Sequence, residues 1–452
     1  MTDQTASPAA AAPARPQSLY SYYVVVLLTV AYCFNFIDRQ IIGIVSQDLK
    51  EDLQLADWQL GLLKGFAFAL LYTLAGIPIA RWADRSNRVR IVSIAVATWS
   101  AFTVLCGYAQ NFTQLLLARI GVGIGEAGGT PPSHSIISDY FSKEQRASAL
   151  GIYSLGIPFG MMFAFIAGGW LTAEFGWRGA LIGVGAPGVV LALLIYLTVR
   201  EPERGAADGP ALAKADGGET MSVWQAAKHL FSIPTYAWAC AGITAASFTA
   251  YAFASWIVPF YLRAHVGSPE TLGLDAFKAE FTTLMVILGL ISGGAYGLGT
   301  FLGGYLTEQA ARRDRANYMR IPAIAMLLTL PAGAVQLFAG DYTTSLIFAA
   351  VTQILLGMYL APTFALVQTL APLHIRALST AIFFFVLNLI ALGVGPSFVG
   401  VASDLFAAQD GDPEGLRWAL ATAGIGIALS VVFYWMAAAH TQADWRRATG
   451  DD

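Results

Sequence analysis

Stretches of about 20 mainly apolar residues recur along the chain, separated by shorter polar segments that carry most of its charge. A helix of that length is long enough to cross the hydrocarbon core of a bilayer. The pattern predicts an all-α polytopic membrane protein with twelve transmembrane helices. The expected spans are 20–46, 57–80, 89–109, 112–138, 147–172, 177–199, 235–262, 280–307, 320–339, 342–370, 376–404 and 416–440.

The polar segments predict how the spans are grouped and oriented. Residues 1–19 are rich in Ala and Pro, lack the pattern of a signal peptide, and are expected to be a disordered tail. Most of the 26 Lys and Arg residues fall on one side if both termini are cytoplasmic, which fits the positive-inside rule. The polar interval 201–234 is expected to be a cytoplasmic linker. It would join two six-helix bundles, 20–200 and 235–440, and a C-terminal tail follows at 441–452.

Composition supports the membrane class and excludes several others. Of the 452 residues, 56% are hydrophobic and 12% are charged, whereas a soluble domain has about 25% charged residues. No strongly basic segment suggests nucleic acid as a partner. Cys33, Cys106 and Cys240 all lie in apolar stretches and are expected to be small buried residues. We expect no metal, no cofactor and no catalytic centre.

Four charged residues interrupt the apolar stretches of the first bundle. Asp38 and Arg39 lie in the first span, and Arg119 and Glu126 lie in the fourth. An ionised side chain at bilayer depth costs at least about 2.5–3.5 kcal/mol, so such residues need partners, water or a function. Two readings stay open: a polar site in the centre of the helix bundle, or ion pairs that only hold two helices together.

Spacing places these residues on shared helix faces. Arg119 and Glu126 are seven residues apart, about two turns, and Asn35 and Arg39 are four apart. Arg can bind a carboxylate or phosphate with two parallel hydrogen bonds. If an anionic substrate engaged the arginine, its carboxylate partner would tend to take up a proton. We expect Glu126 to be the titrating group, with Asp38 as a second candidate.

The chain resembles the major facilitator superfamily, and within it the Spinster family. A small residue, an acid four later and a base four after that occur after the second span and again after the eighth, as an internal repeat. The narrower match rests on Asn35-Phe-Ile-Asp38-Arg39, on Arg119-Ile-Gly-Val-Gly-Ile-Gly-Glu126, and on Ile157-Pro158-Phe-Gly160. The two copies of the repeat are Ala80-Arg-Trp-Ala-Asp84-Arg85-Ser-Asn-Arg88 and Gly304-Tyr-Leu-Thr-Glu308-Gln-Ala-Ala-Arg312.

This resemblance implies a monomeric secondary transporter that works by rocker-switch alternating access. Spinster proteins transport sphingolipids and lysophospholipids, some with proton coupling, and the short loops suggest a bacterial member in the inner membrane. Helices 1 and 4 would line the cavity, so the expected substrate-binding residues are Asn35, Asp38, Arg39, Arg119 and Glu126. A cytoplasmic gate would comprise Asp84, Arg85, Arg88, Glu308 and Arg312.

The sequence is also compatible with functions other than lipid transport. A proton-coupled transporter of small organic anions such as sugar acids is the alternative within the class, because arginine-lined cavities serve those too. An intramembrane enzyme using Asp38 and Glu126, or a scaffold that does not transport, is less favoured. Lys64 is expected to extend to the membrane–water interface or to face the cavity. Asp404 is expected to lie near the cytoplasmic end of its helix.

Overall fold

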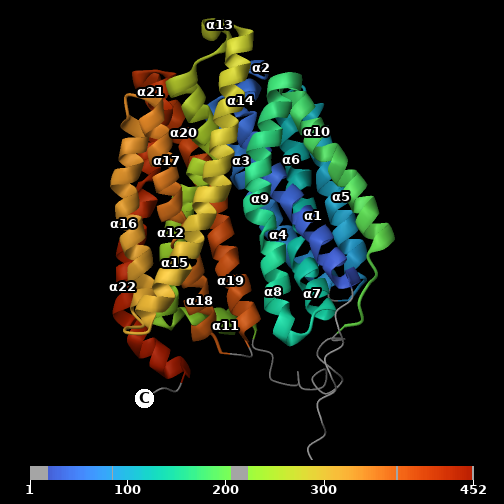
Figure 1. Ribbon diagram of the computed structural model, residues 1–452, viewed down its shortest axis with the longest axis vertical. Helices are drawn as coiled ribbons and strands as arrows, with labels where there is room; N and C mark the ends of the chain where they lie inside the picture. Colours follow the sequence, from blue (N-terminus) through green and yellow to red (C-terminus); the bar gives the residue numbers. More distant parts are fainter. Residues whose placement is uncertain (1–18, 84, 205–221, 373–374, 450–452) are drawn as a thin grey trace, which may run out of the picture.

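A computed structural model of the chain describes residues 19–83, 85–204, 222–372 and 375–449, and all regular elements in these ranges are helices (Figure 1). The first bundle contains α1 (Leu19–Ile44), α2 (Ser46–Asp52), α3 (Asp57–Lys64), α4 (Phe66–Ala83), α5 (Arg88–Gly107), α6 (Phe112–Glu126), α7 (Thr130–Tyr140), α8 (Lys143–Ser154), α9 (Gly156–Phe163), the π-helical turn η1 (Ala164–Gly168) and α10 (Gly169–Thr198).

The second bundle follows a short helix, α11 (Val223–Phe231), that Ser222 and Gln225 cap at its N-terminus. Its elements are α12 (Pro234–Tyr261), η2 (Leu262–Val266), α13 (Pro269–Leu272), α14 (Leu274–Leu290), η3 (Ile291–Ala295), α15 (Tyr296–Ala311), α16 (Asn317–Phe338), α17 (Tyr342–Gly357), α18 (Leu360–Leu370), α19 (Arg376–Leu387), η5 (Asn388–Leu392), α20 (Gly393–Asp410), α21 (Asp412–Ala423) and α22 (Ile425–Thr449).

Twelve spans emerge from these elements. In the described residues, ten helical stretches are long and apolar enough to cross a membrane. One of them, Ser148–Thr198, contains two spans, because Gly176 adopts φ 67° and breaks the helix between them. Another span is α6 with α7, which a short turn interrupts at Ala127–Gly129. The predicted all-α polytopic fold is therefore confirmed.

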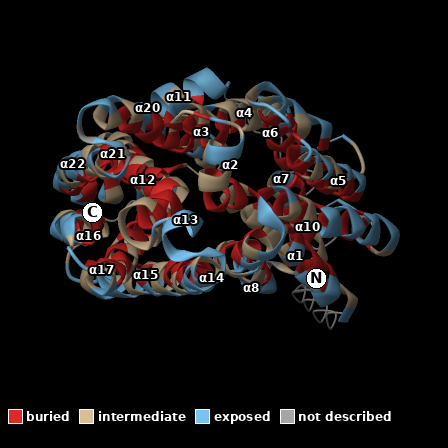
Figure 2. Ribbon diagram, turned by 90° about the horizontal axis from the view of Figure 1, so that it is seen from above, coloured by how far each residue is buried: buried red, intermediate tan, exposed pale blue. Residues whose placement is uncertain are grey.

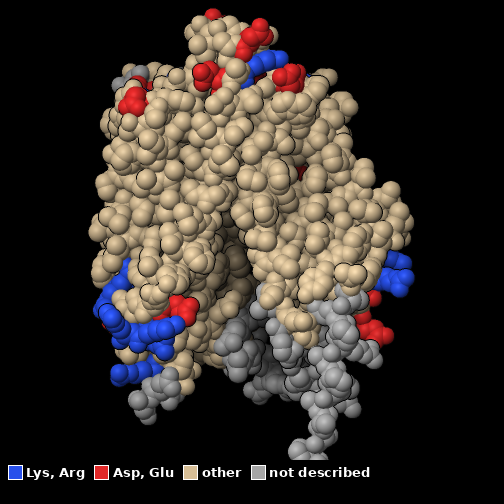
Figure 3. All heavy atoms as spheres, in the orientation of Figure 1, with Lys and Arg blue, Asp and Glu red and all other residues tan. Residues whose placement is uncertain are grey.

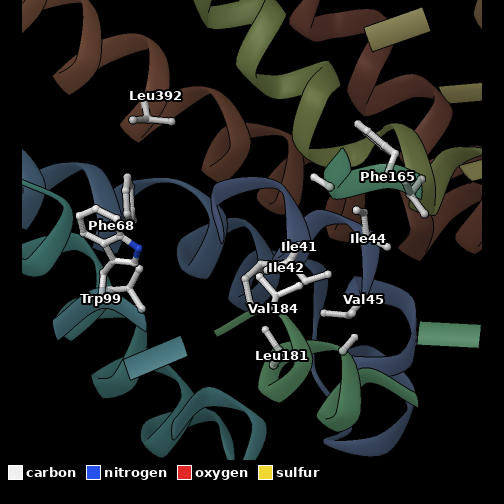
Figure 4. Packing of buried hydrophobic residues seen from close by; sticks show 14 of the residues in the cluster. Ile41, Ile42, Ile44, Val45, Phe68, Trp99, Phe165, Leu181, Val184 and Leu392 are labelled. Atoms are coloured by element: carbon white, nitrogen blue, oxygen red, sulfur yellow. The ribbon is translucent and has the colours of Figure 1, made fainter. Parts of the chain in front are cut away.

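Packing is tight where helices face each other. Figure 2 shows buried residues on the faces that the helices turn inward and exposed residues on the outer surface. In Figure 4, Ile41 and Ile42 of α1 lie against Leu181 and Val184 of α10, and all four side chains are buried. Outward-facing apolar side chains such as Leu197, which is 69% exposed, suit contact with lipid tails.

The two bundles touch at one end and separate at the other. We call the end that carries α2, α13 and α21 the upper end, and the end where α1 begins and α22 ends the lower end (Figure 1). Figure 3 shows the bundles in contact above and a cleft that widens between them toward the lower end. In the same view most of the visible Lys and Arg lie near the lower end, together with some Asp and Glu, and the upper end shows mainly Asp and Glu.

Glycines allow the close contact of the upper half. The position of a Cβ on Gly400 of α20 would lie 2.4 Å from the carbonyl oxygen of Asp57, and one on Gly61 of α3 would lie 2.8 Å from that of Pro396. Gly43 of α1 approaches the backbone of Ser255 in the same way, at 3.3 Å. The absence of side chains at these positions brings backbones of the two bundles together, as is common for helix pairs in membranes.

Candidate functional site

The four charged residues of the first bundle meet between α1 and α6, but each pairs across the two helices. Arg39 donates from Nε to Oε2 of Glu126 at 2.7 Å. Arg119 lies with Nη1 3.9 Å from Oδ1 of Asp38, which also accepts a hydrogen bond from the hydroxyl of Thr103 on α5. Each of these two ion pairs therefore connects α1 with α6, and neither joins two residues of the same helix.

This cluster contains buried polar atoms that its own pairs leave unsatisfied. Nε and Nη1 of Arg119, Oε1 of Glu126 and Oδ1 of Asn35 are buried and have no hydrogen-bond partner among the described residues. Asn35, Arg119 and Glu126 are each at most 3% exposed. Most buried polar groups in proteins have partners, so a cluster of exceptions points to a ligand, an ion or water as the missing partner.

Aromatic rings of α4 separate the two guanidinium groups. The ring centre of Phe68 is 5.4 Å from Cζ of Arg39 and 5.4 Å from Cζ of Arg119. Tyr72, one turn further, lies 4.9 Å from Cζ of Arg39. Gly123 of α6 allows this approach, because a Cβ there would lie 3.0 Å from the carbonyl oxygen of Phe68. Cation–π contacts of this kind stabilise a buried guanidinium without using its hydrogen-bond donors.

The second bundle faces this cluster with tyrosines. Tyr251 of α12 is close enough to interact electrostatically with Arg39 and Tyr72. Tyr296 of α15 and Tyr359 lie further along the same wall, and the hydroxyls of Tyr359 and Ser247 are 2.9 Å apart. The structure shows an aromatic wall that also carries hydroxyl groups.

A second charged cluster, which we call the upper latch, joins the bundles above this site. Asp57 of α3 accepts hydrogen bonds from Nη1 and Nη2 of Arg263 at 2.6 and 2.8 Å, and another from Ser403 of α20 at 2.7 Å. Asp404 accepts from the backbone N–H groups of Asp57 and Trp58 at 3.0 and 2.7 Å, which caps the N-terminus of α3. The contacts between the bundles thus involve the side chains of Asp57, Arg263, Ser403 and Asp404.

The expectation for Asp404 was therefore wrong. It lies at the upper end, opposite the loops that carry Arg85 and Arg312, because its helix runs from the lower end upward. Lys64 also lies between the bundles: its Nζ is 3.6 Å from the ring centre of Trp256 and has no hydrogen-bond partner in the described residues. It faces the interface of the two bundles and is 7% exposed, so it does not extend to a polar surface.

The two repeated loops at the lower end differ. In the first, Arg88 is 2% exposed and donates to Glu201 from Nε at 2.7 Å, to Ser135, and to Asp139. In the second, Glu308 and Arg312 pair with each other at 3.4 Å on an exposed surface. Arg85 is exposed, and Asp84 lies outside the described residues. Among the described residues, no ion pair joins the two loops.

Comparison with known proteins fits this architecture. Residues 28–396 match the model of the Major Facilitator Superfamily. The chain belongs to this family. Membership makes it a multi-pass integral membrane transporter, in agreement with its apolar helices.

Relatives within the superfamily carry different names. An MFS-type efflux pump of Mycolicibacterium smegmatis is 29% identical over 92% of both chains. A D-galactonate transporter of Escherichia coli is 27% identical over 94% of this chain and 96% of its own length. The crystal structure of a bacterial homologue of the human lysosomal transporter Spinster, inward-facing and unoccupied, has 30% identity and a TM-score of 0.85. It covers 95% of this chain and 99% of its own. The resemblance to Spinster proteins is thus confirmed.

Sequence reasoning missed two parts of the site. Thr103 and the pair of Asp57 and Arg263 depend on contacts between helices far apart in the chain. Asp57 and Arg263 are next to the ends of apolar stretches, where charged residues are ordinary interfacial groups. The available signal was Asp57 at the start of a helix whose glycines, Gly61 and Gly65, predict close packing.

Proposed function

We propose that this protein is a proton-coupled secondary transporter of an amphipathic lipid with an anionic head group, of the sphingolipid or lysophospholipid class. The observation that carries the proposal is the guanidinium of Arg119, buried beside the Arg39–Glu126 pair, with two nitrogens that donate no hydrogen bond to the described residues. A phosphate or carboxylate head group would supply the acceptors that Arg119 lacks, with two parallel hydrogen bonds. The tyrosines of the second bundle would contact the remainder of the molecule.

Proton coupling follows from the position of Glu126. Its side chain is fully buried, Arg39 binds one carboxylate oxygen, and the other accepts no hydrogen bond from the described residues. An anionic head group that draws Arg39 away would leave a buried carboxylate without a counter-charge. Burying an unpaired charge is costly, so Glu126 would take up a proton. Asp38, held by Thr103 and Arg119, would respond in the same way if the substrate engages Arg119.

Charge distribution and similarity support an inward-facing state. The lower end, where basic residues gather, would be cytoplasmic by the positive-inside rule, which also places both termini there (Figure 3). The cleft between the bundles opens toward that end, and the solved Spinster homologue with a TM-score of 0.85 is described as inward-facing. In rocker-switch exchange the upper latch would open while the lower loops close.

A second candidate substrate is a small sugar acid. The similarity to a D-galactonate transporter and the hydroxyls of Tyr251, Tyr296 and Tyr359 both favour it. A sugar acid has the same anionic group for Arg119, but it needs hydrogen bonds where a lipid needs apolar contact. The two candidates therefore share the charged cluster and differ at the second bundle.

Proteoliposomes that contain a pH-sensitive dye distinguish these substrates. We expect lysophosphatidylglycerol to drive proton movement, and Arg119→Ala to abolish it. Arg446→Ala, a change on an exposed part of α22, is the matched control and should transport normally. If D-galactonate drives proton movement and the lysolipid does not, the sugar acid is the substrate. Transport of the lysolipid without any proton movement would contradict the coupling.

A further inference from the structure

A groove of about 570 Å³ opens on the outer surface of the second bundle, away from the central cluster. It lies between α15, α16 and the end of α17, near the lower end of the molecule. Its polar edge comprises Gln309, Arg313 and Asn317, and its apolar wall includes Ile324, Leu328 and Leu355. The volume is within the range of about 300–1,000 Å³ that is usual for small-molecule sites.

Arg313 lies at the polar edge of this groove. The acids nearby in the chain have other partners: Glu308 binds Arg312 at 3.4 Å and Asp314 binds Arg320 at 2.6 Å. Among the described residues, no acid forms an ion pair with Arg313. The guanidinium is exposed, so it is available to an external anion.

In the first bundle, the arginine of the repeated loop has acidic partners within the bundle. There the repeated loop places Arg88 against Asp139 at the end of the fourth span and Glu201 after the sixth. In the second bundle the tenth span ends with α18, whose sequence, Leu-Ala-Pro-Thr-Phe-Ala-Leu-Val-Gln-Thr-Leu, contains no acid. The internal repeat therefore keeps a basic loop in both halves, but among the described residues only the loop of the first bundle has acidic partners from other spans.

We propose that this groove binds an anionic membrane phospholipid, with its phosphate on Arg313 and one acyl chain along α16. This goes beyond the transport substrate, because the groove is separate from the charged cluster between α1 and α6. Basic pockets between transmembrane helices on the cytoplasmic side are typical sites for anionic lipid head groups.

The dimensions of the groove fit this arrangement. Asn317 begins α16 and Leu328 lies eleven residues further, which is roughly 16 Å along the helix axis at 1.5 Å per residue. The lining changes in that direction from polar side chains at the loop to apolar ones inside the expected bilayer. A phospholipid has the same order, from charged phosphate to hydrocarbon.

Lipid binding to the purified full-length protein tests the proposal. Native mass spectrometry would measure adducts of dioleoyl phosphatidylglycerol, with dioleoyl phosphatidylcholine as the zwitterionic comparison. We expect preferential binding of phosphatidylglycerol, and a loss of about fivefold in affinity for Arg313→Gln, since one basic residue contributes about 1 kcal/mol to binding of anionic lipid. Arg446→Gln, at the same end but outside the groove, should bind as the native protein does.

A second pair of variants tests the acyl chain. Leu328→Trp would fill the groove and weaken binding, whereas Leu327→Trp should not, because Leu327 has similar exposure (49% against 51%) but does not line the groove. Equal binding of the two lipids, or equal losses for Arg313→Gln and Arg446→Gln, would overturn the proposal. Binding of glycerol phosphate as strong as that of the lipid would also overturn it, and would indicate a site for free phosphate.

Discussion

Single residues in the charged cluster differ in how closely they pair. Arg39 and Glu126 form a close pair with a nitrogen–oxygen distance of 2.7 Å, whereas Arg119 and Asp38 are 3.9 Å apart. The cluster contains two acids and two bases, so its formal charges balance. A purely structural cluster would gain little, because replacing a buried ion pair with apolar residues is often neutral or stabilising. Its unsatisfied donors are better explained by a ligand.

The substitution Glu126→Gln separates charge from shape at this site. Gln keeps the size of the side chain but cannot take up a proton, so transport should lose its dependence on pH. Uptake into proteoliposomes at several pH values measures this. Asp38→Asn is the comparison, and we expect it to keep part of the dependence. An unchanged pH profile in Glu126→Gln, with native folding, would assign the proton to another group.

At the scale of elements, the upper latch joins helices of the two bundles at their upper end. Asp57 begins α3 and binds Arg263, which lies just after α12, and both side chains are at most 5% exposed. Removal of one partner from a buried ion pair typically costs about 3–5 kcal/mol. This cost destabilises only the conformation in which the upper end is closed.

We therefore expect Asp57→Asn to shift the protein toward a state that is open at the upper end. Spin labels on the exposed residues Glu51 of α2 and Glu270 of α13 would report a longer distance in the variant. The double variant Asp57→Asn with Arg263→Gln should recover part of the closed population, because it also removes the buried guanidinium that Asp57→Asn leaves without its carboxylate. Identical distance distributions in all three proteins would exclude a role for the latch.

At the scale of the whole molecule, the sequence was sufficient for the fold and the charged cluster but not for the contacts between bundles. Apolar length predicts a span reliably because a bilayer has a fixed thickness. Asp38 and Glu126 were detectable because charge is rare inside such a span. The cross-pairing of Arg39 with Glu126, and the approach of α3 to α20, depend on packing between distant segments, for which the apolar pattern holds no information.

Glycines at the upper interface make one more prediction, which needs no change of charge. Gly400→Ala would place a methyl group 2.4 Å from the carbonyl oxygen of Asp57, so α20 and α3 must move apart. Overpacking of this kind costs about 1–3 kcal/mol, and only while the upper end is closed. The variant should open the upper end by the same spin-label distance that reports on the latch.

Gly304→Ala provides the matched control, because its added methyl group would lie 3.7 Å from the nearest atom, an ordinary contact. It is also a glycine in a transmembrane helix, but it packs against its own bundle. If both variants keep the native distance, the tight contact of α3 and α20 does not limit opening. If only Gly400→Ala opens the upper end, close backbone packing and the charged latch act together to hold the two bundles in this state.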